Sequence, residues 1–207
     1  MALLKAFVAL LATFVVINQA RADSCTASLR NLVAKHEGDK LCVYVDTTGH
    51  KTIGIGYNLD QNGARQMIES VGANFDDIYS GKKCLTQSQV NVIFSKTIGS
   101  SISGARSAVS SFDSLCCGVQ NVMVDMTFNL GVAGFRSFGT FISDINNKEW
   151  ASAAADMKGT LWCRQVGYRC TDDASYVARG CSGSNVDAAD KQESWLGSLV
   201  SFFSSML

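Results

Sequence analysis

Proline is absent from this chain of 207 residues, and histidine occurs only twice, at His36 and His50. Without proline the chain cannot contain a collagen-like or proline-rich segment, and its turns must depend on glycine, asparagine and aspartate. Neither charge dominates, with 18 basic and 18 acidic residues, which argues against a nucleic-acid binder that relies on a basic surface. A hydrophobic fraction of 47% with only 17% charged residues argues against bulk disorder.

The N-terminus has the pattern of a secretory signal peptide. Lys5 precedes an apolar stretch over residues 6–17, and Ala20-Arg21-Ala22 supplies small residues around a cleavage site. The apolar stretch is shorter than the roughly 20 residues that a transmembrane helix needs. We therefore expect a signal peptide over residues 1–22 and a secreted, extracellular domain over residues 23–207, with no stable membrane insertion. Removal of the signal peptide would leave 16 basic and 18 acidic residues.

The chain has eight cysteines, and all of them lie after residue 22. In a secreted protein an even count favours disulfides over a zinc site or a thiol nucleophile. Cys116 and Cys117 are neighbours on a predicted helix and point about 100° apart, so they need different partners. Cys163 and Cys170 are close enough in sequence to close a short loop. The remaining pairing cannot be deduced from spacing.

The sequence indicates no metal site and no cofactor. His36-Glu37 begins like the zinc motif HExxH, but Lys40 occupies the position of the second histidine. The GxSxG pattern that holds a nucleophilic serine is also missing. Carboxylates are therefore the main candidates for chemistry.

Hydrophobic spacing predicts a short helix, a small β-hairpin and then a larger helical body. Residues 24–36 are expected to form the first helix, and residues 41–45 and 52–57 are expected to form two strands around a turn. Helices are then expected at 115–130, 138–145 and 148–157, and Thr86 begins a capping box. The pattern predicts an α+β fold, in which a hairpin lobe leans on a helical lobe with a central buried helix. That helix would bury Leu115, Val119, Val122, Met126 and Leu130.

Two carboxylates flank the predicted hairpin. Glu37 ends the first helix, Asp46 ends the first strand and Thr52 opens the second. Such an arrangement suits cleavage of a glycosidic bond, because one carboxyl can protonate the leaving oxygen while the other, ionised, activates water. A threonine hydroxyl can help to hold that water. The alternative is that Glu37 and Asp46 are ordinary helix-end and turn residues.

The residues around this pair form a longer pattern, Glu37-Gly38-x-x-Leu41-x-x-Tyr44-x-Asp46-Thr47-x-Gly49-x-x-Thr52-Ile53-Gly54-Ile55-Gly56. This pattern resembles the signature of the phage-type lysozymes, glycoside hydrolase family 24. A second segment, Phe128-Asn129-Leu130-Gly131, is similar to the family's block at the end of its central helix. Trp150 and Trp162 add a weaker third match. The resemblance covers residues 29–162 and implies a lysozyme-like fold.

The resemblance assigns a role to each of the three hairpin residues. Glu37 would be the general acid, while Asp46 and Thr52 would position the attacking water. The family inverts the configuration of the sugar, which requires a carboxyl separation of about 6.5–9.5 Å. The glycines after Thr52 would leave backbone open for close approach of a sugar chain.

Further residues carry weaker expectations. Asn58, Phe128 and Phe138 are candidates for substrate binding, with core packing as the alternative for Phe128. The family often places an arginine of a late helix near the acid. In this chain three late arginines are candidates, and the sequence does not choose among Arg164, Arg169 and Arg179.

The function that follows is that of a secreted lysozyme. It would hydrolyse the β-1,4 bond between N-acetylmuramic acid and N-acetylglucosamine in bacterial peptidoglycan, for antibacterial defence or for digestion of bacteria. The expected partner is the peptidoglycan glycan strand, with no nucleic acid, and the expected state is a monomer. The alternatives are a non-catalytic peptidoglycan-binding protein and a glycosidase that acts on chitin. The amphipathic tail over residues 194–207 lacks a basic face, which favours packing on the protein over membrane binding.

Overall fold

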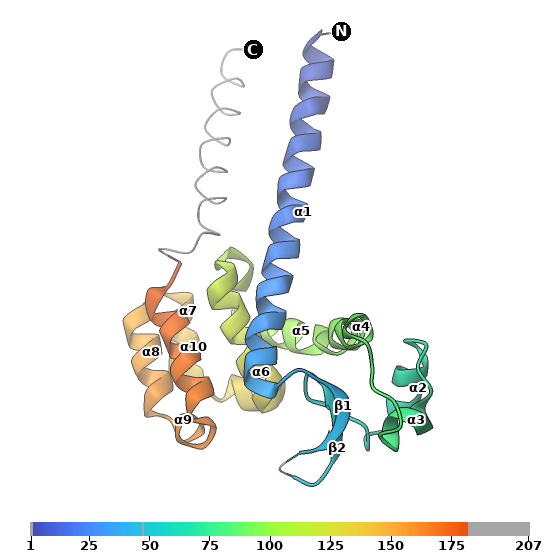
Figure 1. Cartoon of the computed structure of the whole chain (residues 1–207). Helices are drawn as coiled ribbons and strands as arrows, with labels where there is room; N and C mark the ends of the chain where they lie inside the picture. The colour runs from blue at the N-terminus through green and yellow to red at the C-terminus, as the bar shows by residue number, and fades with distance from the viewer. Residues whose placement is uncertain (1, 47, 182–207) are drawn as a thin grey trace. The chain divides into compact units, whose positions relative to one another are not determined.

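The protein is described by a computed structural model over residues 2–46 and 48–181 (Figure 1). The expected tail over residues 194–207 lies outside the described residues. The chain divides into two compact units. We call residues 30–108 and 124–135 the hairpin unit, and the described parts of residues 1–29, 109–123 and 136–207 the helical unit. Together they form an α+β fold that is mostly helical with one small antiparallel sheet, which confirms the predicted fold class.

The first helix is longer than the sequence predicts. Helix α1 spans Ala2–Glu37, whereas the expected start was residue 24. Residues 2–37 contain neither glycine nor proline, so nothing in the backbone interrupts the helix. The helix ends at Glu37, one residue after the expected range, because Gly38 adopts a left-handed φ of 87° and its N–H donates to the Ala34 carbonyl at 2.9 Å. Among the described residues, no helix combines the length and the apolar character that crossing a membrane would require.

The hairpin unit contains a three-stranded sheet with the order β1-β2-β3. Its strands are β1 (Lys40–Val45), β2 (Lys51–Gly54) and β3 (Tyr57–Asn58), and each neighbouring pair is antiparallel. The prediction of one strand over residues 52–57 was therefore wrong. Gly54 and Gly56 have φ values of 64° and 68°, and these left-handed conformations turn the chain back into a third strand.

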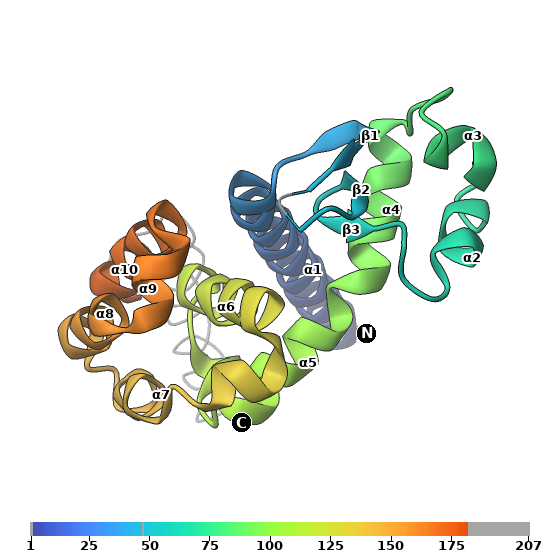
Figure 2. The same ribbon diagram turned by 90° about the horizontal axis from the view of Figure 1, so that it is seen from below.

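Four short helices complete the hairpin unit, with α4 next to the strands (Figure 2). They are α2 (Ala64–Glu69), α3 (Phe75–Tyr79), α4 (Gln87–Thr97) and α5 (Gly99–Ala108). The predicted capping box is confirmed, since Thr86 accepts from the Gln89 N–H and the Gln89 side chain accepts from the Thr86 N–H. Ile53, Ile68 and Ile78 belong to the buried core of this unit.

Helix α6 (Cys117–Arg136) carries the predicted central segment. Val119, Val122 and Met126 are fully buried, as the stripe predicts. Leu115 is buried as well but precedes the helix, and Leu130 is only half-buried, so the prediction was wrong for these two positions on the helix. Gly131 has non-helical angles, φ 70° and ψ 164°, so the regular helix ends at Leu130 before a second helical segment. The end of the predicted helix at residue 130 therefore coincides with this break.

The helical unit also contains a short 3₁₀ turn before α6, η1 (Phe112–Ser114), and the helices that follow α6. Figure 1 shows the last helices gathered around α8. They are α7 (Gly139–Asn146), α8 (Trp150–Gly159), α9 (Leu161–Val166) and α10 (Tyr168–Arg179). The predicted helices at 138–145 and 148–157 correspond to α7 and α8, shifted by one or two residues.

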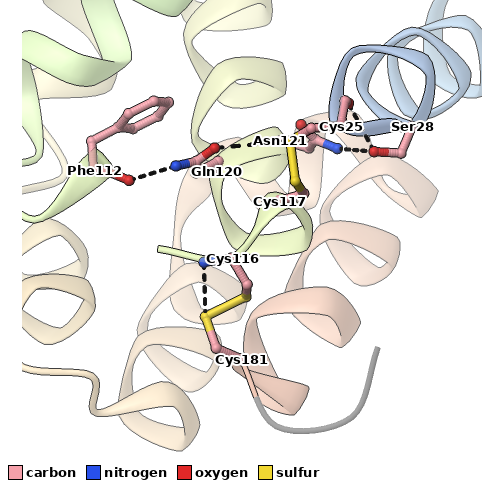
Figure 3. Close-up of a disulfide and its surroundings, with 8 residues drawn as sticks. All are labelled: Cys25, Ser28, Phe112, Cys116, Cys117, Gln120, Asn121 and Cys181. Atoms are coloured by element: carbon pink, nitrogen blue, oxygen red, sulfur yellow. Dashed lines mark hydrogen bonds between the residues drawn. A yellow bond between two sulfur atoms is a disulfide. The ribbon is translucent and has the colours of Figure 1, made fainter. Parts of the chain in front are cut away.

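All eight cysteines form disulfides, which confirms that prediction. Cys116 and Cys117 do have different partners, and Figure 3 shows the two bridges. Beside them, the Asn121 amide donates to the Ser28 hydroxyl at 2.7 Å, and the Gln120 amide donates to the Phe112 carbonyl at 2.8 Å. The bridges join Cys25 to Cys117, Cys42 to Cys84, Cys116 to Cys181 and Cys163 to Cys170.

Candidate active site

Glu37, Asp46 and Thr52 all lie in the hairpin unit. Glu37 is the last residue of α1, Asp46 directly follows β1 and Thr52 lies on β2. Tyr44 pairs with Thr52 across the two strands. Because side chains alternate along a strand, Asp46 falls on the same face of the sheet as Tyr44 and Thr52. The hairpin therefore brings the second carboxylate and the hydroxyl together.

The Asp46 carboxylate is surrounded by donors from its own turn. Its Oδ1 accepts from the Thr48 N–H at 2.9 Å, the Thr48 hydroxyl at 2.8 Å and the His50 N–H at 2.9 Å. These bonds, with the Thr48 hydroxyl first and a smaller contribution from Thr52, lower the pKa of Asp46 to about 2. Asp46 is therefore ionised at any ordinary pH, as a residue that activates water must be.

The Thr52 hydroxyl lies 3.2 Å from Asp46 Oδ2 and 3.3 Å from the His50 carbonyl oxygen. Its single proton can be donated to either oxygen, which leaves its lone pairs able to accept from a water molecule. The residue is only 2% exposed, so its position is fixed by the surrounding sheet.

The Glu37 carboxyl lies against the turn between β2 and β3. A Cβ atom added to Gly56 would come within 3.2 Å of Glu37 Oε2 and 3.5 Å of Glu37 Cβ. Gly56 thus provides room for the acid itself, and Gly54 does the same for the Val90 side chain at 3.1 Å. These two close approaches differ from the sequence-based expectation, which assigned the open backbone to the substrate.

The pKa of Tyr44 is affected by both carboxylates. Burial is the main cause that raises the pKa of its phenol, and the charges of Glu37 and Asp46 raise it further. Its hydroxyl stays protonated at neutral pH and can act as a donor on this face of the sheet. The Lys40 ammonium lies 4.0 Å from the centre of the Tyr44 ring. Tyr44 was part of the recognised pattern, but no role had been predicted for it.

A third carboxylate, Asp60, is hydrogen-bonded to the first residue of β2. Asp60 accepts from the Lys51 N–H at 2.9 Å and from the Tyr79 hydroxyl at 2.8 Å. The Tyr79 hydrogen bond is the largest cause that lowers the pKa of Asp60. The Lys51 ammonium donates to the Tyr79 carbonyl at 2.8 Å. Sequence reasoning missed this group, because nothing in the spacing of Asp60 and Tyr79 indicates that they meet.

The predicted substrate-binding residues occupy different places. Asn58 lies on β3 opposite Thr52, and its side-chain oxygen accepts from the Asp60 N–H at 2.7 Å. Phe128 is a half-buried residue of α6 in the hairpin unit. Phe138 lies in the helical unit, where its ring meets Trp162 edge-on at a centroid distance of 5.9 Å.

Phe138 and Trp162 line an open pocket of about 450 Å³ in the helical unit. The lining also includes Thr140, Asp156 and Gln165. Apolar and aromatic side chains beside a few polar groups are typical of ligand-binding pockets. The structure therefore places Phe138 at a candidate binding surface.

The three late arginines differ in burial. Arg164 is exposed and its guanidinium donates to the Gly159 carbonyl at 3.3 Å. Arg179 is exposed and stacks on the Tyr176 ring at 4.5 Å. Arg169, on α10, is only 7% exposed. Burial thus favours Arg169 over the other two as a functional arginine.

The sequence of this chain is similar to that of known lysozymes. The family model of phage lysozyme matches residues 34–179, which is more than half of the chain. Two proteins of Dictyostelium discoideum, probable T4-type lysozymes 1 and 2, are 27% and 28% identical over 166 and 148 residues. These matches cover 74% and 68% of this chain, and 95% and 87% of the relatives. The chain is also 23% identical over 154 residues to the pre-baseplate central spike protein Gp5 of Enterobacteria phage T4, covering 70% of this chain and 26% of that protein.

The chain belongs to the phage lysozyme family. It is a glycoside hydrolase that cleaves peptidoglycan, as the resemblance in its sequence predicted.

Proposed function

We propose that the protein is an inverting muramidase. It hydrolyses the β-1,4 bond between N-acetylmuramic acid and N-acetylglucosamine, with Glu37 as the general acid and with Asp46 and Thr52 positioning the attacking water. The observation that carries this proposal is the environment of Asp46. Its Oδ1 accepts three hydrogen bonds, its pKa is lowered to about 2, and its Oδ2 lies 3.2 Å from the Thr52 hydroxyl.

The two carboxyls divide the work. The ionised Asp46 accepts a proton from water as the water attacks the anomeric carbon, and the Thr52 hydroxyl fixes the direction of a water lone pair. Glu37, half-buried at the end of α1, donates its proton to the leaving glycosidic oxygen. Direct attack by water leaves no covalent intermediate, so a single displacement inverts the anomeric centre.

The Phe138–Trp162 pocket of the helical unit is a further proposed contact for a sugar ring. An aromatic ring can cover the apolar face of a sugar, while Thr140, Asp156 and Gln165 offer polar groups for its hydroxyls and amides. In the hairpin unit we assign Asn58 and Phe128 to substrate contact as well.

We also propose that residues 1–22 are removed and that the mature chain is a secreted monomer. Four disulfides suit an oxidising compartment. With 16 basic and 18 acidic residues the mature chain gains no electrostatic attraction to anionic bacterial walls. This balance favours digestion of bacteria over a defence that depends on rapid binding.

The test is the loss of turbidity of a peptidoglycan suspension by residues 23–207, with the variants Glu37→Gln and Asp46→Asn alongside. We expect wild type to clear the suspension, and each variant to lose at least about 10²-fold in rate because the proton or the base is gone. Both variants should still bind and sediment with the wall. Clearing by Glu37→Gln at the wild-type rate would contradict the acid assignment, and wall binding without clearing by wild type would identify a binding protein. Faster turnover of chitin oligomers would identify the chitin alternative.

A further inference from the structure

A second titratable pair lies next to the proposed acid. His36 directly precedes Glu37 on α1, and its Nδ1 lies 3.0 Å from Oδ2 of Asp125 on α6. Both side chains are completely buried. The two residues belong to the same compact unit as Glu37, Asp46 and Thr52.

Burial of this pair carries a desolvation penalty that lowers the stability of the folded state. A carboxylate and an imidazole removed from water lose their hydration, and a pair of apolar side chains of similar volume commonly serves a fold equally well. What a hydrogen-bonded pair provides, and an apolar pair does not, is direction. The Nδ1–H···Oδ2 bond fixes the orientation of the imidazole and the distance between the two helices at one point.

The His36–Asp125 hydrogen bond lies in the last turn of α1, and helix ends fray unless they are held. Helix α1 ends at Glu37, and Gly38 leaves the helical conformation at once with a φ of 87°. The last turn of α1 therefore needs an anchor if the Glu37 carboxyl is to keep one position. On its other side the carboxyl meets the backbone of Gly56.

We propose that His36 and Asp125 are positioning residues that hold the terminal turn of α1, and with it Glu37, in the reactive position. This inference rests on the proposed function in assigning catalysis to Glu37. The pair acts through the backbone and does not touch the reacting bond. The competing explanation is that the pair only stabilises the fold.

Four variants separate the two explanations. His36→Leu removes the donor, and His36→Asn retains an N–H at the position of Nδ1. The double variant His36→Leu/Asp125→Leu removes both polar groups of the pair, so that neither is left buried without the other. Ile68→Ala is the matched control, because Ile68 is fully buried in the same unit and its truncation lowers stability by creating a cavity.

We expect kcat on soluble peptidoglycan fragments to fall about 10- to 100-fold in His36→Leu with little change in KM, since small displacements of a catalytic group have effects of this size. His36→Asn should recover most of the rate. The double variant should regain the melting temperature of wild type but not its kcat, and it keeps the test decisive if the single Leu variant does not fold. Ile68→Ala should lose melting temperature and keep kcat.

A readout without turnover separates this inference from the proposed function. The chain has four glutamates and two histidines, so selective ¹³C labelling of glutamate and ¹⁵N labelling of histidine give few signals. We expect the ¹³Cδ resonance of Glu37 to move in His36→Leu and in the double variant, and to stay in place in Ile68→Ala. If wild type fails to cleave peptidoglycan, the proposed function is wrong, and this resonance alone decides whether the pair positions Glu37.

Three results would overturn the inference. One is an unchanged kcat and Glu37 resonance in His36→Leu. Another is recovery of kcat together with melting temperature in the double variant, which would indicate a structural role alone. The third is a loss in His36→Asn as large as that in His36→Leu.

Discussion

The close approach of Gly56 to Glu37 predicts a large effect from one added methyl group. In Gly56→Ala the new Cβ would lie 3.2 Å from Glu37 Oε2 and 3.5 Å from Glu37 Cβ. The distance to Oε2 is shorter than ordinary van der Waals contact, and the distance to Cβ is at its lower edge. The Glu37 side chain therefore has to move away by a few tenths of an ångström. The backbone contributes a separate cost, because φ at Gly56 is 68° and a left-handed residue with a Cβ loses about 1–2 kcal/mol.

The two effects can be separated with a matched glycine. Gly63 also has a left-handed φ, of 84°, but no atom lies within 4 Å of its added Cβ. Gly63→Ala should therefore lower the free energy of unfolding by the same ~1–2 kcal/mol and leave the rate unchanged. Gly56→Ala should show that loss and, in addition, a kcat lower by about 10-fold or more, since misplacement of a catalytic group by ~1 Å can cost ~10²-fold.

The assay is the initial rate of clearing at 20 °C or below, where both variants are folded, together with urea unfolding of each. Equal rates in the two alanine variants would contradict this prediction, because the contact with Glu37 would then have no consequence for catalysis. A loss of rate in Gly63→Ala would refute it as well, since that variant changes only the backbone.

Two further predictions concern the hairpin. In Thr48→Ala the pKa of Asp46 should rise from about 2 towards its ordinary value, because the Thr48 hydroxyl is the largest cause of the lowering. The low pKa of Asp46 stabilises the folded state at pH values above the pKa of an unfolded aspartate, and this stabilisation is lost as the pH falls towards 2. When the pKa rises in Thr48→Ala, the acid limbs of the pH-rate profile and of the pH dependence of stability should therefore move to higher pH. An acid limb that stays in place in a pH-rate profile would contradict the assigned hydrogen bonds. Replacing Cys42 and Cys84 by serine opens a bridge across 42 residues, and chain entropy predicts a loss of about 4 kcal/mol in the free energy of unfolding; urea denaturation with no change in midpoint would exclude that contribution.

The sequence predicted those features that depend on local chemistry. The turn after Asp46, the capping box at Thr86 and, to within one residue, the end of α1 were predicted because each depends on a few neighbouring residues. Cys116 and Cys117 have different partners, as predicted. The reason given was wrong for Cys116, because that residue precedes α6 and does not lie on the helix. The start of α1 was missed, because the predicted cleavage site suggested a boundary that the backbone does not have.

Contacts between segments that are distant in the chain could not be predicted from the sequence. His36 and Asp125 are 89 residues apart, and Asp60 and Tyr79 are 19 apart. Nothing in either spacing indicates a hydrogen bond, since packing of the helices and strands determines which side chains meet. The same holds for the three late arginines, of which only burial distinguishes Arg169.

In the proposed mechanism, water held by Asp46 and Thr52 attacks the sugar directly. The most direct test is ¹H NMR of the anomeric protons in the first minutes of hydrolysis of a β-linked peptidoglycan oligosaccharide, before the product mutarotates. We expect the α-anomer to form first, because a single displacement inverts the β-bond. Initial release of the β-anomer would contradict it, since retention requires a nucleophile and a covalent intermediate.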